Sequence, residues 1–204
     1  EMRMKDLRLT TIAKTRRGVV KIGTSVLIDD LGKLSRRALG GIAGEIAFLQ
    51  NKGIQTLLVS SGAIASGMQA LGIRKRPHAL PTLQACAAIG QPLLVQLYSQ
   101  ALSRARLTAA QVLLTRDDLE DRQRFLNAKE TMAELIGRGV IPIINENDTV
   151  SVEEIRVGDN DNLAALVTNL VQADLLVLLT DRDGLFTADP ARDPEARLVP
   201  IVEN

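Results

Sequence analysis

The sequence predicts an α/β protein: a three-layer αβα sandwich around a central, mainly parallel β-sheet. Short apolar runs alternate along the chain with longer segments in which apolar residues recur at the helical period. The runs are continuous rather than alternating, which is typical of strands that helices cover on both faces. Because strand and helix alternate, we expect right-handed crossovers and a ligand site at the carboxyl ends of the strands. The expected strands are Val19–Ile22, Thr56–Val59, Gln111–Leu114, Val140–Ile144 and Leu175–Leu179.

Helices are expected between these strands, and residues at their ends support the assignment. Ser35 is the predicted N-cap of the first, because its side-chain oxygen can accept a hydrogen bond from a first-turn N–H. Pro81 suits the first turn of another, where a missing N–H costs little. Gly53 and Gly139 are the predicted stops of two helices. The expected helices are Ser35–Lys52, Pro81–Arg104, Arg122–Arg138 and Asn160–Ala173.

The composition is that of an ordinary globular protein, with 46% hydrophobic and 24% charged residues. A formal net charge of +1 and only 2% aromatic residues argue against a nucleic-acid partner. No apolar run approaches the roughly 20 residues of a membrane span, so we expect no membrane partner and a cytoplasmic location. We expect residues 1–18 to be an N-terminal lead-in and residues 19–204 to form one domain, truncated at its C-terminus.

Two predicted strand ends carry residues that suit a phosphate or carboxylate. Lys21 lies inside an apolar strand, where an ammonium group is costly unless it reaches a partner. Gly23 would let a ligand approach the backbone, so Lys21 is a candidate phosphate contact; an edge lysine that extends into water is the alternative. Ser61 and Gly62 lead from the second strand into a helix, whose first N–H groups can bind an anion. A plain N-cap serine is the alternative there.

Two further segments combine amides with acids. Asn145–Asp148 directly follows a predicted strand, and Asp148 could receive a substrate ammonium, although an ordinary polar turn explains the same residues. Arg156–Leu163 places two acids and two amides before a helix of small residues, which is more than helix capping requires. An acid of this segment could hold lysines in place around a phosphate.

Residue types that other mechanisms require are scarce. His78 is the only histidine and Cys86 the only cysteine, so neither a histidine-based hydrolase, a zinc site nor an intrachain disulfide is predicted. The glycine patterns of dinucleotide-binding loops and of Walker A loops do not occur in the sequence. We therefore expect no metal held by protein side chains alone.

Six segments of the sequence carry a family resemblance when they are taken together. They are VVKIGTSVL at Val19–Leu27, VSSGAIASG at Val59–Gly67, LLTRDDLEDRQRFLNA at Leu113–Ala128, INENDTV at Ile144–Val150, VGDNDNLAAL at Val157–Leu166 and LLTDRDGLFTADP at Leu178–Pro190. In this order they resemble the amino acid kinase family, and within it the branch that phosphorylates the side-chain carboxylate of free glutamate. The resemblance implies the first reaction of proline biosynthesis, with L-glutamate, ATP and Mg²⁺, and a homo-oligomer.

The resemblance also implies roles for individual residues. Lys21 would contact the ATP phosphates and stabilise the transferring group, Gly62 would offer its backbone N–H to phosphoryl oxygens, and Asp161 would organise the lysines. Glutamate would be bound by Ser61, Asp148 and Asn160, and the nucleotide site would be lined by Thr180 and Asp181 together with Lys21.

The implied reaction needs no general base, because a glutamate carboxylate with a pKa near about 4.3 is already ionised at neutral pH. Two alternatives stay open: a kinase of the same fold that acts on another carboxylate, and a non-catalytic amino-acid-binding fragment. The family's glycine-rich segment with a second lysine, G-x-G-G-M-x-T-K, does not occur before Asn204. We therefore expect an incomplete nucleotide site, and weak or no turnover from these 204 residues alone.

Overall fold

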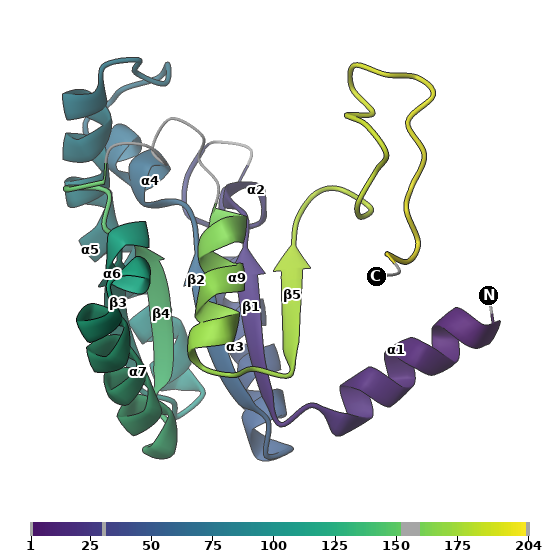
Figure 1. Ribbon diagram of the computed structural model, residues 1–204. Coiled ribbons are helices and arrows are strands. Elements are labelled where there is room, and N and C mark those ends of the chain that lie inside the picture. The colour runs from purple at the N-terminus through teal and green to yellow at the C-terminus, as the bar shows by residue number, and fades with distance from the viewer. Residues whose placement is uncertain (1, 30–31, 152–159, 203–204) are drawn as a thin grey trace.

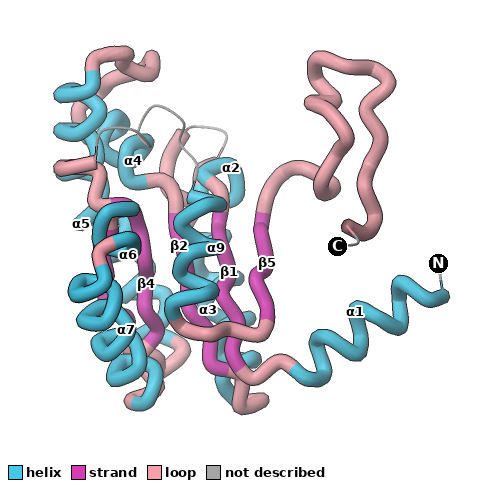
Figure 2. The backbone as a smooth tube through the Cα atoms, in the orientation of Figure 1, coloured by secondary structure: helices cyan, strands magenta, loops and turns pink. Residues whose placement is uncertain are grey.

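The computed structural model describes residues 2–29, 32–151 and 160–202, which contain a five-stranded sheet with every strand parallel (Figure 1, Figure 2). The strands lie in the order β3-β4-β2-β1-β5. The predicted α/β fold is confirmed, and each expected strand is present. The strands are β1 (Arg17–Ile22), β2 (Gln55–Ser60), β3 (Ala109–Leu114), β4 (Ile141–Glu146) and β5 (Leu175–Leu179).

Helices cover both faces of the sheet and complete the predicted three layers (Figure 1). Ser35 caps the first long helix as predicted, because its Oγ accepts a hydrogen bond from the Ala38 N–H at 3.2 Å. One face carries α2 (Thr24–Leu27), α3 (Arg36–Asn51) and α5 (Leu80–Arg104), with α4 (Ala63–Ala70) packed on α5. The other carries α6 (Arg116–Glu120), α7 (Arg122–Gly137) and α9 (Asn160–Leu170).

Successive residues of the central strand β2 enter different apolar clusters on opposite faces of the sheet. Leu57 and Val59 pack with side chains of α7 and α9, whereas Leu58 packs with Leu94 and Tyr98 of α5. All of these side chains are almost completely buried. Because both faces of the central strands are apolar, their sequences read as continuous hydrophobic runs.

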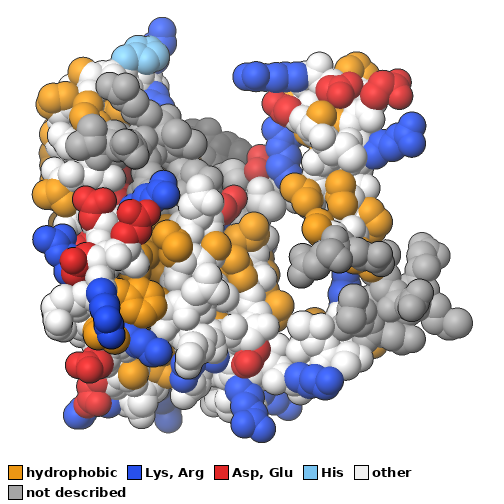
Figure 3. Space-filling model, viewed as in Figure 1, with side chains coloured by type: hydrophobic (Ala, Val, Ile, Leu, Met, Phe, Trp, Pro, Cys, Tyr) orange, Lys and Arg blue, Asp and Glu red, His pale blue; other side chains and the backbone are white. Residues whose placement is uncertain are grey.

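The last strand departs from this pattern. Leu175–Leu179 was expected to be covered on both faces, but Val177 and Leu178 are 36% and 45% exposed. The reason is that β5 is an edge strand, hydrogen-bonded to β1 on one side within the described sheet. Figure 3 shows hydrophobic side chains exposed in this region and on the segment that follows, where Leu185 and Leu198 are also exposed.

The N-terminal region contains a helix, α1 (Met2–Lys14), which projects away from the sheet (Figure 1). β1 begins at Arg17 rather than at Val19 as expected. The Asp174 carboxylate explains this start, because it accepts hydrogen bonds from the backbone N–H groups of Arg16 and Arg17 at 2.8 and 2.9 Å. These two bonds hold the pKa of Asp174 below its usual value.

Helices α4 and α5 meet at two glycines. A Cβ atom added at Gly67 would lie 1.8 Å from the Cys86 carbonyl oxygen, and one at Gly90 would lie 1.8 Å from the Ala63 carbonyl oxygen. Both distances are far inside van der Waals contact, so the two backbones approach as closely as glycine allows. Because α4 begins at Ala63, this contact also holds the turn between β2 and α4 in place.

Gly90→Ala is expected to lower the free energy of unfolding by about 1–3 kcal/mol, because the added methyl group must push α4 away from α5. The measurement is urea denaturation of the variant and the wild type.

Gly44→Ala is the matched control, since Gly44 lies exposed in α3 with no atom near its would-be Cβ. That change removes a flexible residue from a helix interior and should raise the free energy of unfolding by about 0.5–1 kcal/mol. Equal effects of the two substitutions would contradict close backbone contact at Gly90.

Candidate functional site

The carboxyl ends of the parallel strands lie along one edge of the sheet, as the arrowheads in Figure 1 show. The predicted site residues that the structure describes lie at this edge or directly beyond it, and residues 156–159 of the predicted segment Arg156–Leu163 lie outside the described residues. In the order of the strands, the described ones are Asn145–Asp148 at the end of β4, Ser61 and Gly62 after β2, Lys21 in β1, and Thr180 and Asp181 after β5.

Lys21 forms an ion pair with Asp161, with 2.6 Å between its Nζ and the Asp161 Oδ1. Lys21 comes from β1 and Asp161 from the first turn of α9. The lysine side chain is only 12% exposed, and β1 lies between β2 and β5, so Lys21 is not an edge lysine. The carboxylate offsets the cost of an ammonium group in an apolar strand and fixes its position at the sheet edge.

Asn160 links three segments through its side-chain amide. Its Nδ2 lies 2.9 Å from the Ser60 carbonyl oxygen, 3.2 Å from the Ser61 Oγ and 2.9 Å from the Asn145 Oδ1. Asn145 in turn donates from its Nδ2 to the Gln91 Oε1 at 2.8 Å. A chain of amide hydrogen bonds therefore runs from α9 through the end of β4 to the middle of α5.

A second set of hydrogen bonds fixes the turn after β2. The Ser60 Oγ donates to the Ser61 carbonyl oxygen and lies 3.0 Å from the Tyr98 hydroxyl oxygen. Burial raises the pKa of Tyr98 well above its usual value, so the phenol stays neutral. Because the single hydroxyl hydrogen of Ser60 is directed to Ser61, the phenol is the donor of this second hydrogen bond. Gly62 follows with a φ of +104°, a left-handed conformation that glycine adopts readily and that turns the chain into α4.

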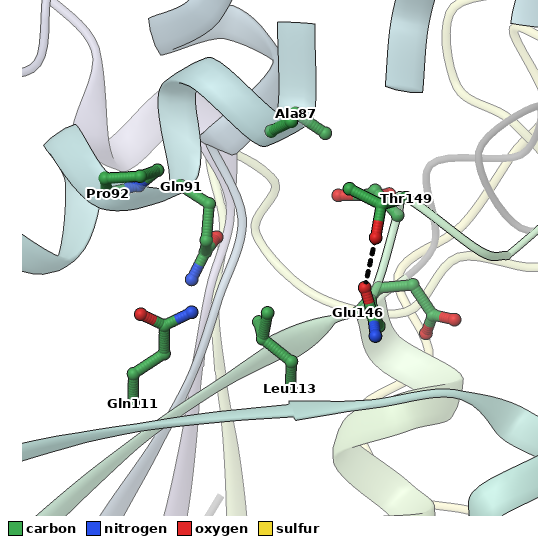
Figure 4. Close-up of a pocket in the computed structure, with 10 residues that line it drawn as sticks. Ala87, Gln91, Pro92, Gln111, Leu113, Glu146 and Thr149 are labelled. Carbon is green, nitrogen blue, oxygen red and sulfur yellow. Dashed lines mark hydrogen bonds between the residues drawn. The ribbon is translucent and has the colours of Figure 1, made fainter. Parts of the chain in front are cut away.

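A cavity of about 210 Å³ lies between α5, β3 and the segment after β4 (Figure 4). Asp148 lines this cavity, and so does Gln91. The dashed line in Figure 4 is the hydrogen bond from Thr149 to Asn147 in the same loop, at 2.7 Å. The cavity is connected to the other candidate residues through Gln91 and its bonded partner Asn145, whereas Ser61 and Asn160 do not line it themselves.

The end of β5 lies beside the end of β1. The Gly23 N–H donates to the Leu179 carbonyl oxygen at 3.0 Å, which places Thr180 and Asp181 at the same edge as Lys21. Both side chains are exposed, and the Thr180 hydroxyl donates to the Asp181 carboxylate at 3.3 Å. Within the described ranges, no three His, Cys, Asp or Glu side chains are grouped as a metal site.

The sequence profile of the amino acid kinase family matches residues 16–204. The chain belongs to this family. A likeness to the solved UMP kinase of Bacillus anthracis agrees with the fold: the TM-score is 0.56 at 16% identity, over 90% of this chain and 72% of that one. No helix in the described part of the chain is long and apolar enough to cross a membrane.

Curated relatives of this amino acid kinase are named glutamate 5-kinase. The protein of Pelobacter propionicus is 53% identical over 197 residues, which is 97% of this chain and 53% of the relative. The proteins of Aromatoleum aromaticum and Nitrosospira multiformis are each 55% identical, over 92% and 93% of this chain and 51% of each relative. The chain therefore spans about half the length of the relatives that it matches.

The structure of this kinase-family chain brings Lys21 to Asp161, and Asn160 to Ser61. It places Asp148 in the neighbouring cavity and Gly62 at the start of α4. Their roles toward substrates stay predictions. Sequence reasoning missed four residues that hold the site together: Ser60, Gln91, Tyr98 and Asn145. The signal for Gln91 was an amide at a position that continues the apolar face of α5 between Ala87 and Leu94. That for Asn145 was its place in the segment that supplied Asp148.

Asn145→Asp is expected to destabilise the protein, because a carboxylate oxygen would replace the Nδ2 that donates to Gln91. Two buried acceptors would face each other, lowering the free energy of unfolding by about 1–3 kcal/mol at neutral pH. Burial raises the pKa of such a carboxyl, and its protonated form can donate again. The deficit should therefore shrink as pH falls toward the unfolded pKa near about 4. Urea denaturation of the variant and the wild type, at neutral and at mildly acidic pH, measures this loss in the free energy of unfolding.

Asn127→Asp, on the exposed side of α7, is the control for this substitution. Its effect should stay within about 0.5 kcal/mol at either pH. If Asn145→Asp were as mild as the control, the bond between Gln91 and Asn145 would not contribute to stability.

Proposed function

We propose that this chain is the amino-acid-kinase part of an enzyme that transfers the γ-phosphoryl group of ATP to the γ-carboxylate of L-glutamate. The products are L-glutamyl 5-phosphate and ADP, and the reaction is the first step of proline biosynthesis. The observation that carries the proposal is the Lys21 ammonium group, which Asp161 holds at the carboxyl-end edge of the sheet. The same edge borders a cavity lined by the acidic residues Glu146 and Asp148. The likeness to glutamate 5-kinases at 52–55% identity supports the choice of substrate.

The reaction requires charge control rather than proton transfer. A γ-carboxylate oxygen of glutamate attacks the γ-phosphorus, and the bond from that phosphorus to the bridging oxygen breaks, so that ADP leaves with the electron pair. The carboxylate is already ionised and the product is an acyl phosphate, so no proton has to move. The protein must align two anions and stabilise negative charge on the transferred group.

Three residues suit that stabilisation. Lys21 would place its ammonium group against the transferring phosphoryl oxygens, and Asp161 would keep it there. Gly62 precedes the first turn of α4, and the first N–H groups of a helix have no partner within the helix, so they can donate to an anion. None of the three needs to change its protonation state during the reaction.

The substrates would occupy neighbouring parts of the sheet edge. Ser61 accepts a hydrogen bond from Asn160, which leaves the serine proton available for a glutamate carboxylate. Asp148 would hold the glutamate ammonium group in the cavity. Thr180 and Asp181 would line the nucleotide, since they follow β5 beside Lys21.

Mg²⁺ fits this site as part of the nucleotide complex. Because the described residues offer no cluster of three metal-ligating side chains, phosphate oxygens would supply most of the ligands of Mg²⁺. The charge of the ion would help to neutralise the phosphates. The homo-oligomeric state and the cytoplasmic location stay predictions from the sequence.

Trapping of the acyl phosphate tests the reaction. With glutamate, MgATP and hydroxylamine, a protein extended to the full length of the relatives should form γ-glutamyl hydroxamate and ADP in equal amounts. The 204-residue chain should give little or none. Product from aspartate but not glutamate would point to another carboxylate, and glutamate binding without ADP formation would point to an amino-acid-binding protein.

Substitutions in the full-length protein should separate the two halves of the site. Lys21→Ala should lower kcat by about a hundredfold or more, because an interaction of the transition state is lost, with KM for glutamate nearly unchanged. Asp148→Asn should raise KM for glutamate about ten- to a hundredfold with a smaller effect on kcat. Glu45→Gln, on the exposed side of α3, should change neither. An equal loss in kcat and in glutamate affinity for Lys21→Ala would contradict its role.

A further inference from the structure

Gln91 carries a buried hydrogen-bond donor that the fold leaves unpaired. The residue is 7% exposed, and its Nε2 has no hydrogen-bond partner in the described part of the chain. An unpaired buried amide nitrogen costs about 1–3 kcal/mol, and native proteins avoid most such groups. In Figure 4 the Gln91 side chain points from α5 into the cavity, toward Gln111 and Leu113 of β3. A donor in this position indicates a ligand that supplies an acceptor.

The direction of the amide chain shows why the nitrogen, rather than the oxygen, faces the cavity. The backbone carbonyl of Ser60 can only accept, so Asn160 must turn its Nδ2 toward it. The same nitrogen donates to the Asn145 Oδ1, which turns the Asn145 Nδ2 toward Gln91. Gln91 must then present its Oε1 to Asn145, and its Nε2 is left for the cavity. The orientation of each amide thus follows from one backbone acceptor.

The chemistry of the cavity lining suits the head group of an amino acid. Among the described residues that line it, the charged ones are both acidic, Glu146 and Asp148. Carboxylates favour an ammonium group, but they repel the carboxylate that accompanies it in a free amino acid. A neutral amide donor such as Gln91 can bind that carboxylate without neutralising the acids nearby. Charge-assisted hydrogen bonds of this kind are stronger than those between neutral groups.

We propose that Gln91 determines specificity for the α-carboxylate of the substrate, by donating a hydrogen bond from its Nε2. The inference rests on the proposed function and deepens it, because the γ-carboxylate must reach Lys21 and Gly62 at the ends of β1 and β2. The cavity lies on the other side of β2, at the ends of β3 and β4. The α-carboxylate and the ammonium group are therefore the parts of glutamate that remain for Gln91 and Asp148.

A substrate pair tests the role of Gln91: L-glutamate and its α-amide, isoglutamine. Both have a free γ-carboxylate, so the chemical step is the same, and only the group facing Gln91 differs. The measured quantity is the ratio of kcat/KM for glutamate to that for isoglutamine in the full-length protein. We expect the wild type to favour glutamate at least about tenfold. The α-amide has lost the charge and one oxygen of the carboxylate, and its carbonyl oxygen accepts only a weaker, neutral hydrogen bond from the Gln91 Nε2.

Gln91→Glu should lower this ratio about ten- to a hundredfold, because the variant keeps an oxygen for Asn145 but presents an acceptor to the cavity. That acceptor repels the α-carboxylate and can accept a hydrogen bond from the amide of isoglutamine. The ratio compares two substrates on the same protein, so a smaller folded fraction does not affect it. Gln96→Glu, an exposed glutamine in the same helix, is the control and should leave the ratio unchanged.

Two results would overturn the inference and leave the proposed function standing. In both, the Gln91→Glu protein keeps the wild-type ratio: either its activity is unchanged, or its activity falls equally with both substrates, as expected if Gln91 only supports Asn145. If Gln91→Glu shows no turnover, calorimetric titration measures its affinities for glutamate and for isoglutamine. A ratio of affinities equal to that of the wild type would contradict the proposed role of Gln91. A wild-type protein that does not phosphorylate glutamate would instead refute the proposed function, and this inference with it.

Discussion

The hydrogen bond from the Asn160 side chain to the Ser60 carbonyl is the constraint on which the site depends. It ties the first residue of α9 to the last residue of β2 and so fixes where α9 begins above the sheet. Asp161 is the next residue of the helix, and its contact with Lys21 follows from that position. The same amide nitrogen also holds Asn145 at the end of β4. One backbone acceptor thus aligns the ends of three strands with a helix.

The order of the strands arranges the chemical groups in a row. The cavity with its acidic lining lies at β3 and β4, the turn with Gly62 follows β2, and the ammonium group of Lys21 comes from β1. Groups that suit an ammonium ion are therefore at one end, and groups that suit phosphate are at the other. The substrates proposed above, a small zwitterionic acid beside a triphosphate, match this order of groups along one parallel sheet.

Much of the fold could be predicted from the sequence because local patterns determine it. Apolar runs identified the strands, and Ser35 identified the start of α3. The exposure of β5 could not be predicted, since Leu175–Leu179 reads the same whether the strand is central or at an edge. Gln91 was missed for a related reason: its partner Asn145 is distant in sequence, and their meeting depends on how α5 lies over β4. Motif positions locate a site, whereas packing between elements decides which side chains complete it.

The close approach of α4 and α5 has a consequence for how the sequence can vary. Gly90 touches the backbone at Ala63 and is followed directly by Gln91, while Ala63 follows Gly62. The turn at Gly62 and the amide of Gln91 that faces the cavity are therefore coupled through direct backbone contact. A substitution that shifts the backbone at Ala63 or at Gly90 would shift both the Gly62 turn and the Gln91 amide. We therefore expect related sequences to change Ala63 and Gly90 jointly or not at all.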